Sequence, residues 1–213
     1  MYAPAAFATD DPETLAAMIA RAPLATLVVA GPGGLEAAHL PMLHDAAAGV
    51  LIGHLARGNP LAALDGAPAM AVFVGPEAYV SPGFYASKRE HGKVVPTWNY
   101  EAVHVHGRLE RFEQPEALLA VVTALTEQFE AERPQPWSVS DAPEAYVAGL
   151  LKAIVGVRLV IARVEAVRKL SQNKDAADRA GVRAGLSASD RPGDRAVAAL
   201  MEAPSPMKSL RHD

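Results

Sequence analysis

The stretch LATLVVAGPGGLEAAHLP, residues 24–41, decides the class of fold. Its first half, Ala25–Ala30, is rich in aliphatic and β-branched residues, which favour extended backbone. Gly31–Gly34 contains three glycines and a proline, which suit a tight turn, and the apolar segment Leu35–Leu43 follows. Two strands joined by such a turn predict a β-hairpin, and therefore a fold based on antiparallel strands.

Further strands are expected along the chain in segments rich in Val, Leu and Ile. They are Val50–Leu55, Ala69–Val74, Ala78–Ser81, Ala102–Leu109 and Val157–Val167.

Helices are expected before and after this run of strands. The first begins after Asp11, whose carboxylate can cap it, and ends near Ala22-Pro23. The others are expected over Pro115–Glu132, Pro143–Ile154, Asp175–Leu186 and Asp194–Met201. Because strands and helices do not alternate along the chain, we predict an α+β fold with a small antiparallel barrel. A dinucleotide-binding fold is not supported, because no GxGxxG motif opens a helix.

The chain has 213 residues, so we expect one main domain, over residues 1–186. Residues 187–213 are expected to form a C-terminal tail, with a short helix before a frayed end. No apolar run approaches the roughly 20 residues that cross a bilayer, and no signal peptide is recognisable. The chain has no cysteine. A cytoplasmic protein is therefore expected.

Charge is distributed unevenly along the chain. Residues 1–157 hold 9 Lys/Arg and 17 Asp/Glu, whereas residues 158–213 hold 11 and 7. Duplex DNA is bound by a concentrated cationic face, so this acidic body argues against direct DNA binding.

Polar residues cluster in the middle of the chain, at the expected strand ends. One cluster is His39-Leu40-Pro41, and a second is GHLARGNP, residues 53–60. Arginine grips phosphate oxygens, and glycine lets backbone N–H groups approach them, so the second cluster can form a phosphate cradle. The alternative is purely structural: Asn59 would cap a short helix at Pro60.

A third cluster combines aromatic rings and cations. It runs from Tyr79 through Lys88, Arg89 and Lys93 to VVPTWNY, residues 94–100. A flat, anionic heteroaromatic ligand needs ring faces for stacking and positive groups for its phosphate. The alternative is that these rings belong to the core or barrel rim and that the cations are solvated.

Neither a metal site nor a nucleophile is predicted from sequence. His104 and His106 alternate on one strand face and could ligate a metal, but no third ligand is evident and the chain lacks cysteine. No GxSxG motif marks a serine nucleophile.

Together the clusters resemble the PaiB family of FMN-binding negative transcriptional regulators. The resemblance is collinear over nearly the whole chain, although Phe84 stands where the family pattern has tryptophan. The matching segments are MYAP (1–4), HLP (39–41), GHLARGNP (53–60), FVGPEAYVSPGFY (73–85), GKVVPTWNY (92–100), VSDAP (139–143), LLKAIVG (150–156) and KLSQNK (169–174).

The resemblance implies a six-stranded antiparallel Greek-key split β-barrel with peripheral helices, and a homodimer with FMN at the subunit interface. It places the isoalloxazine ring along one strand and the phosphate and ribityl chain at the second and third clusters. The cofactor-binding residues it implies are His39, Leu40, Pro41, His54, Arg57, Asn59, Lys88, Lys93, Thr97, Trp98, Asn99, Lys169 and Gln172.

Three functions stay open at this point. The family name implies a flavin-dependent regulator. An FMN-dependent oxidoreductase is the alternative, because the cofactor itself carries the redox chemistry. A haem-binding split barrel would use His54, His104 or His106 as its axial ligand.

Overall fold

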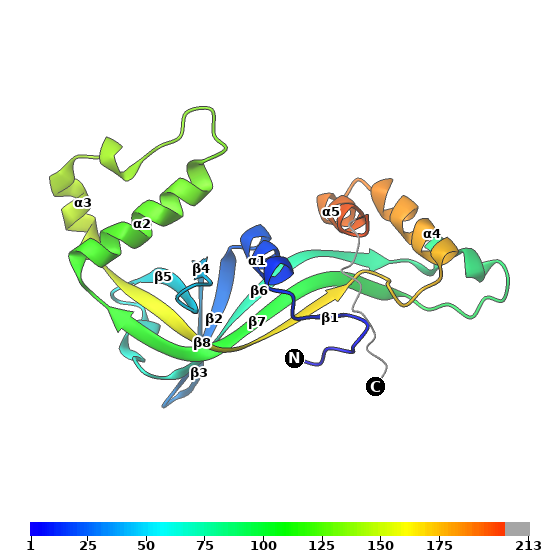
Figure 1. The fold of residues 1–213 in the computed structure, drawn as a ribbon, viewed down its shortest axis with the longest axis horizontal. Coiled ribbons are helices and arrows are strands. Elements are labelled where there is room, and N and C mark those ends of the chain that lie inside the picture. The colour runs from blue at the N-terminus through cyan, green and yellow to red at the C-terminus, as the bar shows by residue number, and fades with distance from the viewer. Residues whose placement is uncertain (203–213) are drawn as a thin grey trace. The chain divides into compact units, whose positions relative to one another are not determined.

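The computed structural model describes residues 1–202 and has an α+β fold, as predicted (Figure 1). The tail predicted to fray after residue 202 lies outside the described residues. The strands are β1 (Ala8–Thr9), β2 (Leu24–Gly31), β3 (Gly34–Pro41), β4 (Leu43–Asp45), β5 (Val50–Ala56), β6 (Pro68–Val80), β7 (Thr97–Phe112) and β8 (Ile154–Lys169). The helices are α1 (Pro12–Arg21), α2 (Pro115–Glu130), α3 (Glu144–Leu151), α4 (Ala176–Ser187) and α5 (Pro192–Leu200).

The predicted hairpin is confirmed. β2 and β3 pair antiparallel along their full length, from Leu24 opposite Pro41 to Gly31 opposite Gly34. Gly34 has φ +121°, a conformation that side-chain-bearing residues rarely adopt. The glycine-rich turn therefore sets the register of the hairpin.

Several predicted strand boundaries were wrong, including the start of β8, which lies three residues before the predicted Val157. The segment Leu35–Leu43 is divided at Met42, which is buried and donates its N–H to the carbonyl of Pro23. The two strands expected around Gly75-Pro76 form one strand, β6. β7 begins at Thr97, five residues before the predicted start, and within this added stretch Asn99 is buried and donates to Ser171 Oγ.

The sheet contains eight strands in the described part of the chain. Their order is β3-β2-β6-β7-β8-β5-β4, with β1 paired to β8. Six strands have seven residues or more, and β1 and β4 are the two short ones. The path ends at β3 and β4, so the recorded pairings do not close it into a barrel.

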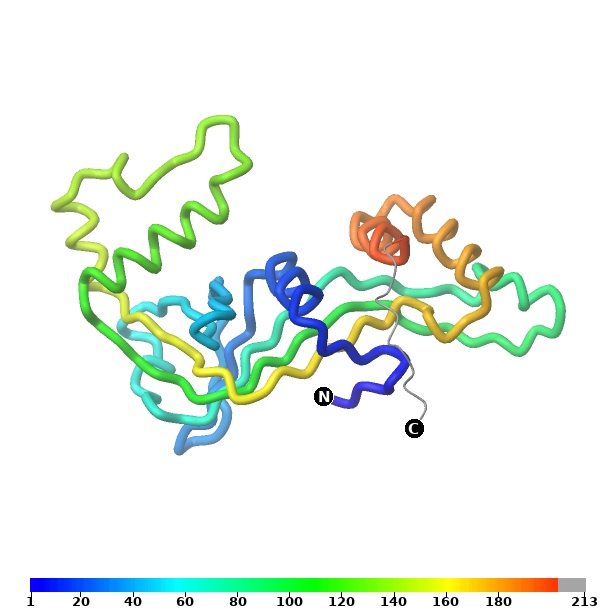
Figure 2. The backbone as a smooth tube through the Cα atoms, in the orientation of Figure 1, coloured from blue at the N-terminus to red at the C-terminus, as the bar shows by residue number. Residues whose placement is uncertain are grey.

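The chain divides into two compact units. Unit 1 comprises Met1, Thr9–Val74 and Ala102–Ala166. Its main core is formed by apolar side chains of α1 and of the strands, including Leu27, Phe73 and Val105. A second cluster packs α2 against the strands through residues such as Leu118 and Leu125. Figure 2 follows the chain from β7 into α2 within this unit.

Within the described residues, unit 2 comprises Tyr2–Ala8, Gly75–Glu101 and Val167–Glu202. Its core packs α4 and α5 against the ends of the strands, through Val182, Leu186 and Val197 together with Ala78 and Val80. Across residues 1–202, no helix has both the length and the apolar character needed to span a bilayer.

Candidate functional site

A polar pocket of about 230 Å³ lies within unit 2, and we call it the lysine pocket. Thr97 and Asn99 project from the same face of β7, because alternate residues of a strand point the same way. Lys169 ends β8, and the turn that follows adds Ser171. The lining residues are Phe7, Tyr85, Val95, Pro96, Thr97, Asn99, Lys169, Ser171, Asn173 and Lys174.

Lys169 is the central cation of the lysine pocket. Its Nζ donates to Thr97 Oγ1 at 2.5 Å. Burial lowers the pKa of the Lys169 ammonium from its ordinary value, because desolvation disfavours the charged form. None of the ion pairs found within residues 1–202 includes Lys169. A half-buried cation without a carboxylate partner is suited to an anionic ligand.

A second lysine lines the same pocket. Lys174 lies over the Tyr85 ring, with Nζ 4.9 Å from its centroid. Its charge also helps to lower the pKa of Asp178, although hydrogen bonds from Ser87 are the larger cause. None of the described residues that line the pocket is acidic, so the lining carries positive charge.

A buried polar pair holds the back of the lysine pocket. The Asn99 amide donates to Ser171 Oγ at 2.9 Å, and both residues are buried. Ser171 has φ 62°, a left-handed conformation that is uncommon for serine. The Gln172 side chain supports this turn by accepting from the Leu170 N–H at 2.6 Å and donating to the Arg168 carbonyl. Gln172 therefore shapes the turn through its own amide.

The structure thus brings together three of the predicted residues, Thr97, Asn99 and Lys169. Trp98 lies between the first two on β7 and points to the opposite face, where its ring meets Tyr79 edge-on at 6.0 Å.

Lys88 and Lys93 are exposed and do not line the pocket. The sequence analysis missed Ser171, Asn173 and Lys174 as individual site residues, although all three lie in the KLSQNK motif.

In unit 1, His54 and Pro41 line a second, more apolar pocket of about 320 Å³ together with Phe129 and Trp137. His54 Nδ1 is buried without a hydrogen-bond partner in the described structure. Burial lowers the pKa of His54 from its ordinary value, which favours the neutral imidazole. A buried ring nitrogen beside a cavity can bond to a ligand.

The other residues predicted in the hairpin have local roles. His39 Nδ1 lies 3.0 Å from the hydroxyl of Thr26, its cross-strand neighbour. Leu40 is buried in the main core of unit 1.

Arg57 and Asn59 stabilise the chain after β5. The Arg57 guanidinium donates to the carbonyls of Lys152 and Ile154 and pairs with Glu113 at 2.9 Å. Asn59 Oδ1 accepts from the Leu61 N–H at 3.0 Å and so caps the short 3₁₀ turn at Pro60. Asn59 therefore acts as the helix cap that was considered as the alternative to a phosphate ligand. A phosphate at Arg57 would have to compete with the three protein contacts of its guanidinium.

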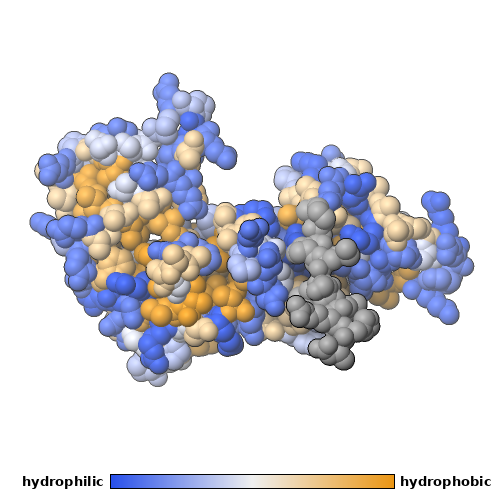
Figure 3. Space-filling view, in the orientation of Figure 1, coloured by the Kyte–Doolittle hydropathy of each residue, from blue (hydrophilic) through white to orange (hydrophobic). Residues whose placement is uncertain are grey.

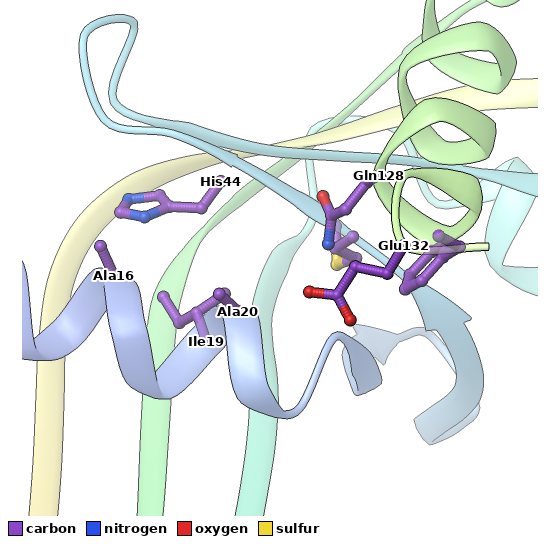
Figure 4. Close-up of a pocket in the computed structure, with 8 residues that line it drawn as sticks. Ala16, Ile19, Ala20, His44, Gln128 and Glu132 are labelled. Atoms are coloured by element: carbon purple, nitrogen blue, oxygen red, sulfur yellow. The ribbon is translucent and has the colours of Figure 1, made fainter. Parts of the chain in front are cut away.

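A third pocket in unit 1, of about 560 Å³, lies between α1 and the C-terminal end of α2. Figure 4 shows Gln128, in the last turn of α2, and Glu132, just after the end of α2, projecting toward the space above Ile19 and Ala20, with His44 facing α1. Burial lowers the pKa of His44, so a neutral imidazole is favoured there.

Comparison with known proteins identifies the family. The family model described as "Putative FMN-binding domain" matches residues 1–163. Protease synthase and sporulation protein PAI 2 of Bacillus subtilis is 32% identical over 206 residues, which cover 95% of this chain and 97% of that protein. An uncharacterized protein of Aspergillus fumigatus is 36% identical over 194 residues, covering 70% of this chain and 74% of that protein.

Two solved structures share the fold. The FAD and haem binding protein of Mycobacterium smegmatis has a TM-score of 0.57 at 20% identity, covering 81% of this chain and 78% of its own. The flavocytochrome Anf3 of Azotobacter vinelandii has a TM-score of 0.56 at 17% identity, covering 81% and 74%. From the family match and the Bacillus relative, the chain belongs to the PaiB-type family of FMN-binding proteins.

Proposed function

We propose that the lysine pocket receives the phosphate of FMN. The phosphate monoester carries a charge of about −1.5 to −2 at neutral pH. Lys169 offers a half-buried positive charge that no described carboxylate neutralises, and this observation carries the proposal. Thr97 and Ser171 place hydroxyl groups beside it, which can donate to phosphate oxygens.

The size of the lysine pocket supports a partial role in holding the cofactor. Pockets that enclose a whole drug-sized ligand have volumes of about 300–1,000 Å³. At about 230 Å³ the lysine pocket suits the phosphate end alone.

Unit 1 by itself contains another pocket that we propose contacts a flavin, lined by Pro41, predicted along the ring, and by His54, predicted near the phosphate and ribityl chain. His54 Nδ1 is buried and unpaired in the described structure, and Pro41 lies beside it in an apolar pocket. An imidazole nitrogen can hydrogen-bond to a polar edge of the isoalloxazine, while proline and aromatic side chains exclude water from it. When bound, FMN would supply the redox chemistry, and the residues of this chain would bind and orient it.

We propose that the working form is a homodimer in which each flavin contacts both subunits. In support, large apolar side chains are exposed on and between α2 and α3, and a groove of about 570 Å³ runs between these helices. The space-filling view shows hydrophobic residues gathered on the surface of unit 1 (Figure 3). Contiguous exposed apolar surface is typical of interaction sites. The exposed residues are Leu119, Phe129, Trp137, Tyr146 and Leu150.

The split barrel is the scaffold that we propose for this site. The six long strands equal in number the strands of the Greek-key split barrel implied by the family resemblance. The regulatory role of the family would then act through flavin occupancy, since the acidic body of the chain is poorly suited to duplex DNA.

Titration of the purified protein with FMN, followed by quenching of flavin fluorescence, tests the phosphate site. Lys169→Ala should weaken binding about tenfold or more, because a hydrogen bond to a charged group contributes about 1.5–3 kcal/mol. Lys169→Arg should retain most of the affinity. Lys152→Ala, which removes an exposed lysine of unit 1, is the matched control. Unchanged FMN affinity in folded Lys169→Ala would refute the proposed phosphate site.

A further inference from the structure

Three metal-ligating side chains that are not assigned to the flavin lie together in unit 1. His104 and His106 project from one face of β7, and Glu165 projects from the neighbouring strand β8. One ligand atom of each lies within 4.8 Å of the others. We call these three residues the His₂Glu cluster.

The spacing of the cluster approaches that of a metal site. Zinc binds histidine nitrogen and carboxylate oxygen at about 2.0–2.2 Å, so two ligand atoms on one ion are at most about 4.4 Å apart. His106 Nε2 and Glu165 Oε2 are already 2.9 Å apart. A change in the His104 side chain of less than about 1 Å would bring the third nitrogen into range.

The burial of the cluster also suits a metal. All three residues are half-buried, so an ion could reach them and still be partly shielded from water.

We propose that the His₂Glu cluster binds a divalent transition-metal ion such as Zn²⁺, with a coordination position left open. Two histidines and one carboxylate are a donor set that binds zinc or non-haem iron. Within residues 1–202, no other group of three or more His, Cys, Asp or Glu side chains brings its ligand atoms this close together. No metal site was predicted from sequence, because the chain lacks cysteine and no third ligand was evident. Glu165 lies 59 residues beyond His106, on another strand.

Two cations compete with the metal for this cluster. The Met1 amino group contacts Glu165 Oε2 at 2.6 Å. The Arg163 guanidinium lies 3.8 Å from the same oxygen and 3.3 Å from His106 Nε2. A bound metal would have to share or displace both of them. Removing the Arg163 charge should therefore tighten metal binding, whereas a purely structural ion-pair cluster would gain no metal affinity from this change.

Metal binding is tested by titrating metal-free protein, with any tag at its C-terminus, with Zn²⁺ in competition with a chromophoric chelator. The wild type should bind one Zn²⁺ per chain in addition to FMN. His104→Ala, His106→Ala and Glu165→Gln should each weaken binding more than tenfold, because loss of even an outer-shell partner costs about 10–100-fold. His91→Ala, which removes an exposed histidine of unit 2, should leave the zinc affinity unchanged.

Arg163→Gln should bind Zn²⁺ more tightly than the wild type. A misfolded variant would not show such a gain in zinc affinity, so this result separates metal binding from misfolding. Co²⁺ substitution should produce visible ligand-field absorption that His106→Ala abolishes. Absence of saturable Zn²⁺ binding to the wild type, or equal binding by the three ligand variants, would show that the His₂Glu cluster is an ion-pair network only. FMN binding by each variant reports separately on the flavin site.

Discussion

The side-chain amide of Asn99 and the hydroxyl of Ser171, 72 residues apart in sequence, form a fully buried hydrogen-bonded pair 2.9 Å long. This pair joins β7 to the turn after β8, where Ser171 adopts its left-handed conformation. It thereby positions the residues on either side, Thr97 and Lys169, whose side chains meet at the lysine pocket. The pair is a positioning element for the proposed phosphate site.

Asn99→Ala should lower the free energy of unfolding by about 1–3 kcal/mol, because Ser171 loses its buried partner. Urea unfolding followed by circular dichroism measures this change. Asn173→Ala, at an exposed position on the same turn, should change stability by less than about 0.5 kcal/mol. Equal stability of Asn99→Ala and the wild type would contradict the role given to the pair.

The carboxylate of Asp178 gives unit 2 a dependence on pH. It accepts from the Ser87 N–H at 3.0 Å and from the Ser87 hydroxyl at 2.8 Å, and the backbone hydrogen bond is the largest cause of its lowered pKa. A pKa lowered in the folded state contributes stability above the ordinary value near 3.8, and this stability is lost as the pH falls through the folded pKa.

Unfolding measured from pH 7 down to pH 2.5 tests this dependence. Asp178→Asn should be less stable than the wild type at pH 7, and the difference should shrink as the pH falls below about 4. Asp190→Asn, at an exposed carboxylate, serves as the control. A stability difference between Asp178→Asn and the wild type that stays constant down to pH 2.5 would show that Asp178 does not act through its charge.

His54→Leu should separate ligand binding from stability. The variant removes a buried nitrogen that has no partner in the described structure, so the cofactor-free protein should be as stable as the wild type or more stable. Its FMN affinity should fall, because the proposed contact to the flavin is lost. Calorimetric unfolding of the cofactor-free protein and a flavin titration measure the two effects. A fall in stability with unchanged FMN affinity would assign His54 to the core instead.

Sedimentation velocity tests the proposed dimer. The FMN-loaded protein should sediment with twice the 22.4 kDa mass of the chain. Leu150→Glu, which places a charge on the exposed apolar surface of α3, should shift the protein toward monomer and weaken FMN binding with it. A monomeric wild type that binds FMN with full affinity would rule out a flavin site shared between subunits.

Local signals in the sequence predicted much of the fold and part of the site. The glycine-rich turn at residues 31–34 fixed the hairpin, and the capping residue Asp11 marked the start of α1. The family resemblance predicted Thr97, Asn99 and Lys169 as site residues. Alternation along β7 places Thr97 and Asn99 on one face of the strand and turns Trp98 to the other. Alternation along β7 was therefore sufficient to place Trp98 on the opposite face.

Contacts between distant segments could not be predicted in the same way. Glu165 completes the His₂Glu cluster only because β8 pairs beside β7. Arg57 was expected to hold phosphate, but the structure directs its guanidinium to carbonyls at the end of α3 and the start of β8 and to Glu113. Such partners depend on which strands pair, and the pattern of residues within one segment does not predict that pairing.

Lys169 is proposed to hold the phosphate of FMN, and comparing FMN with riboflavin is the sharpest test of this role, since the two ligands differ only by that phosphate. The wild type should bind FMN at least tenfold more tightly than riboflavin, and this preference should weaken as salt rises. Lys169→Ala should bind riboflavin as the wild type does and lose most of its preference for FMN. If Lys169→Ala keeps the full preference for FMN over riboflavin, the phosphate is bound elsewhere and the role proposed for Lys169 is wrong.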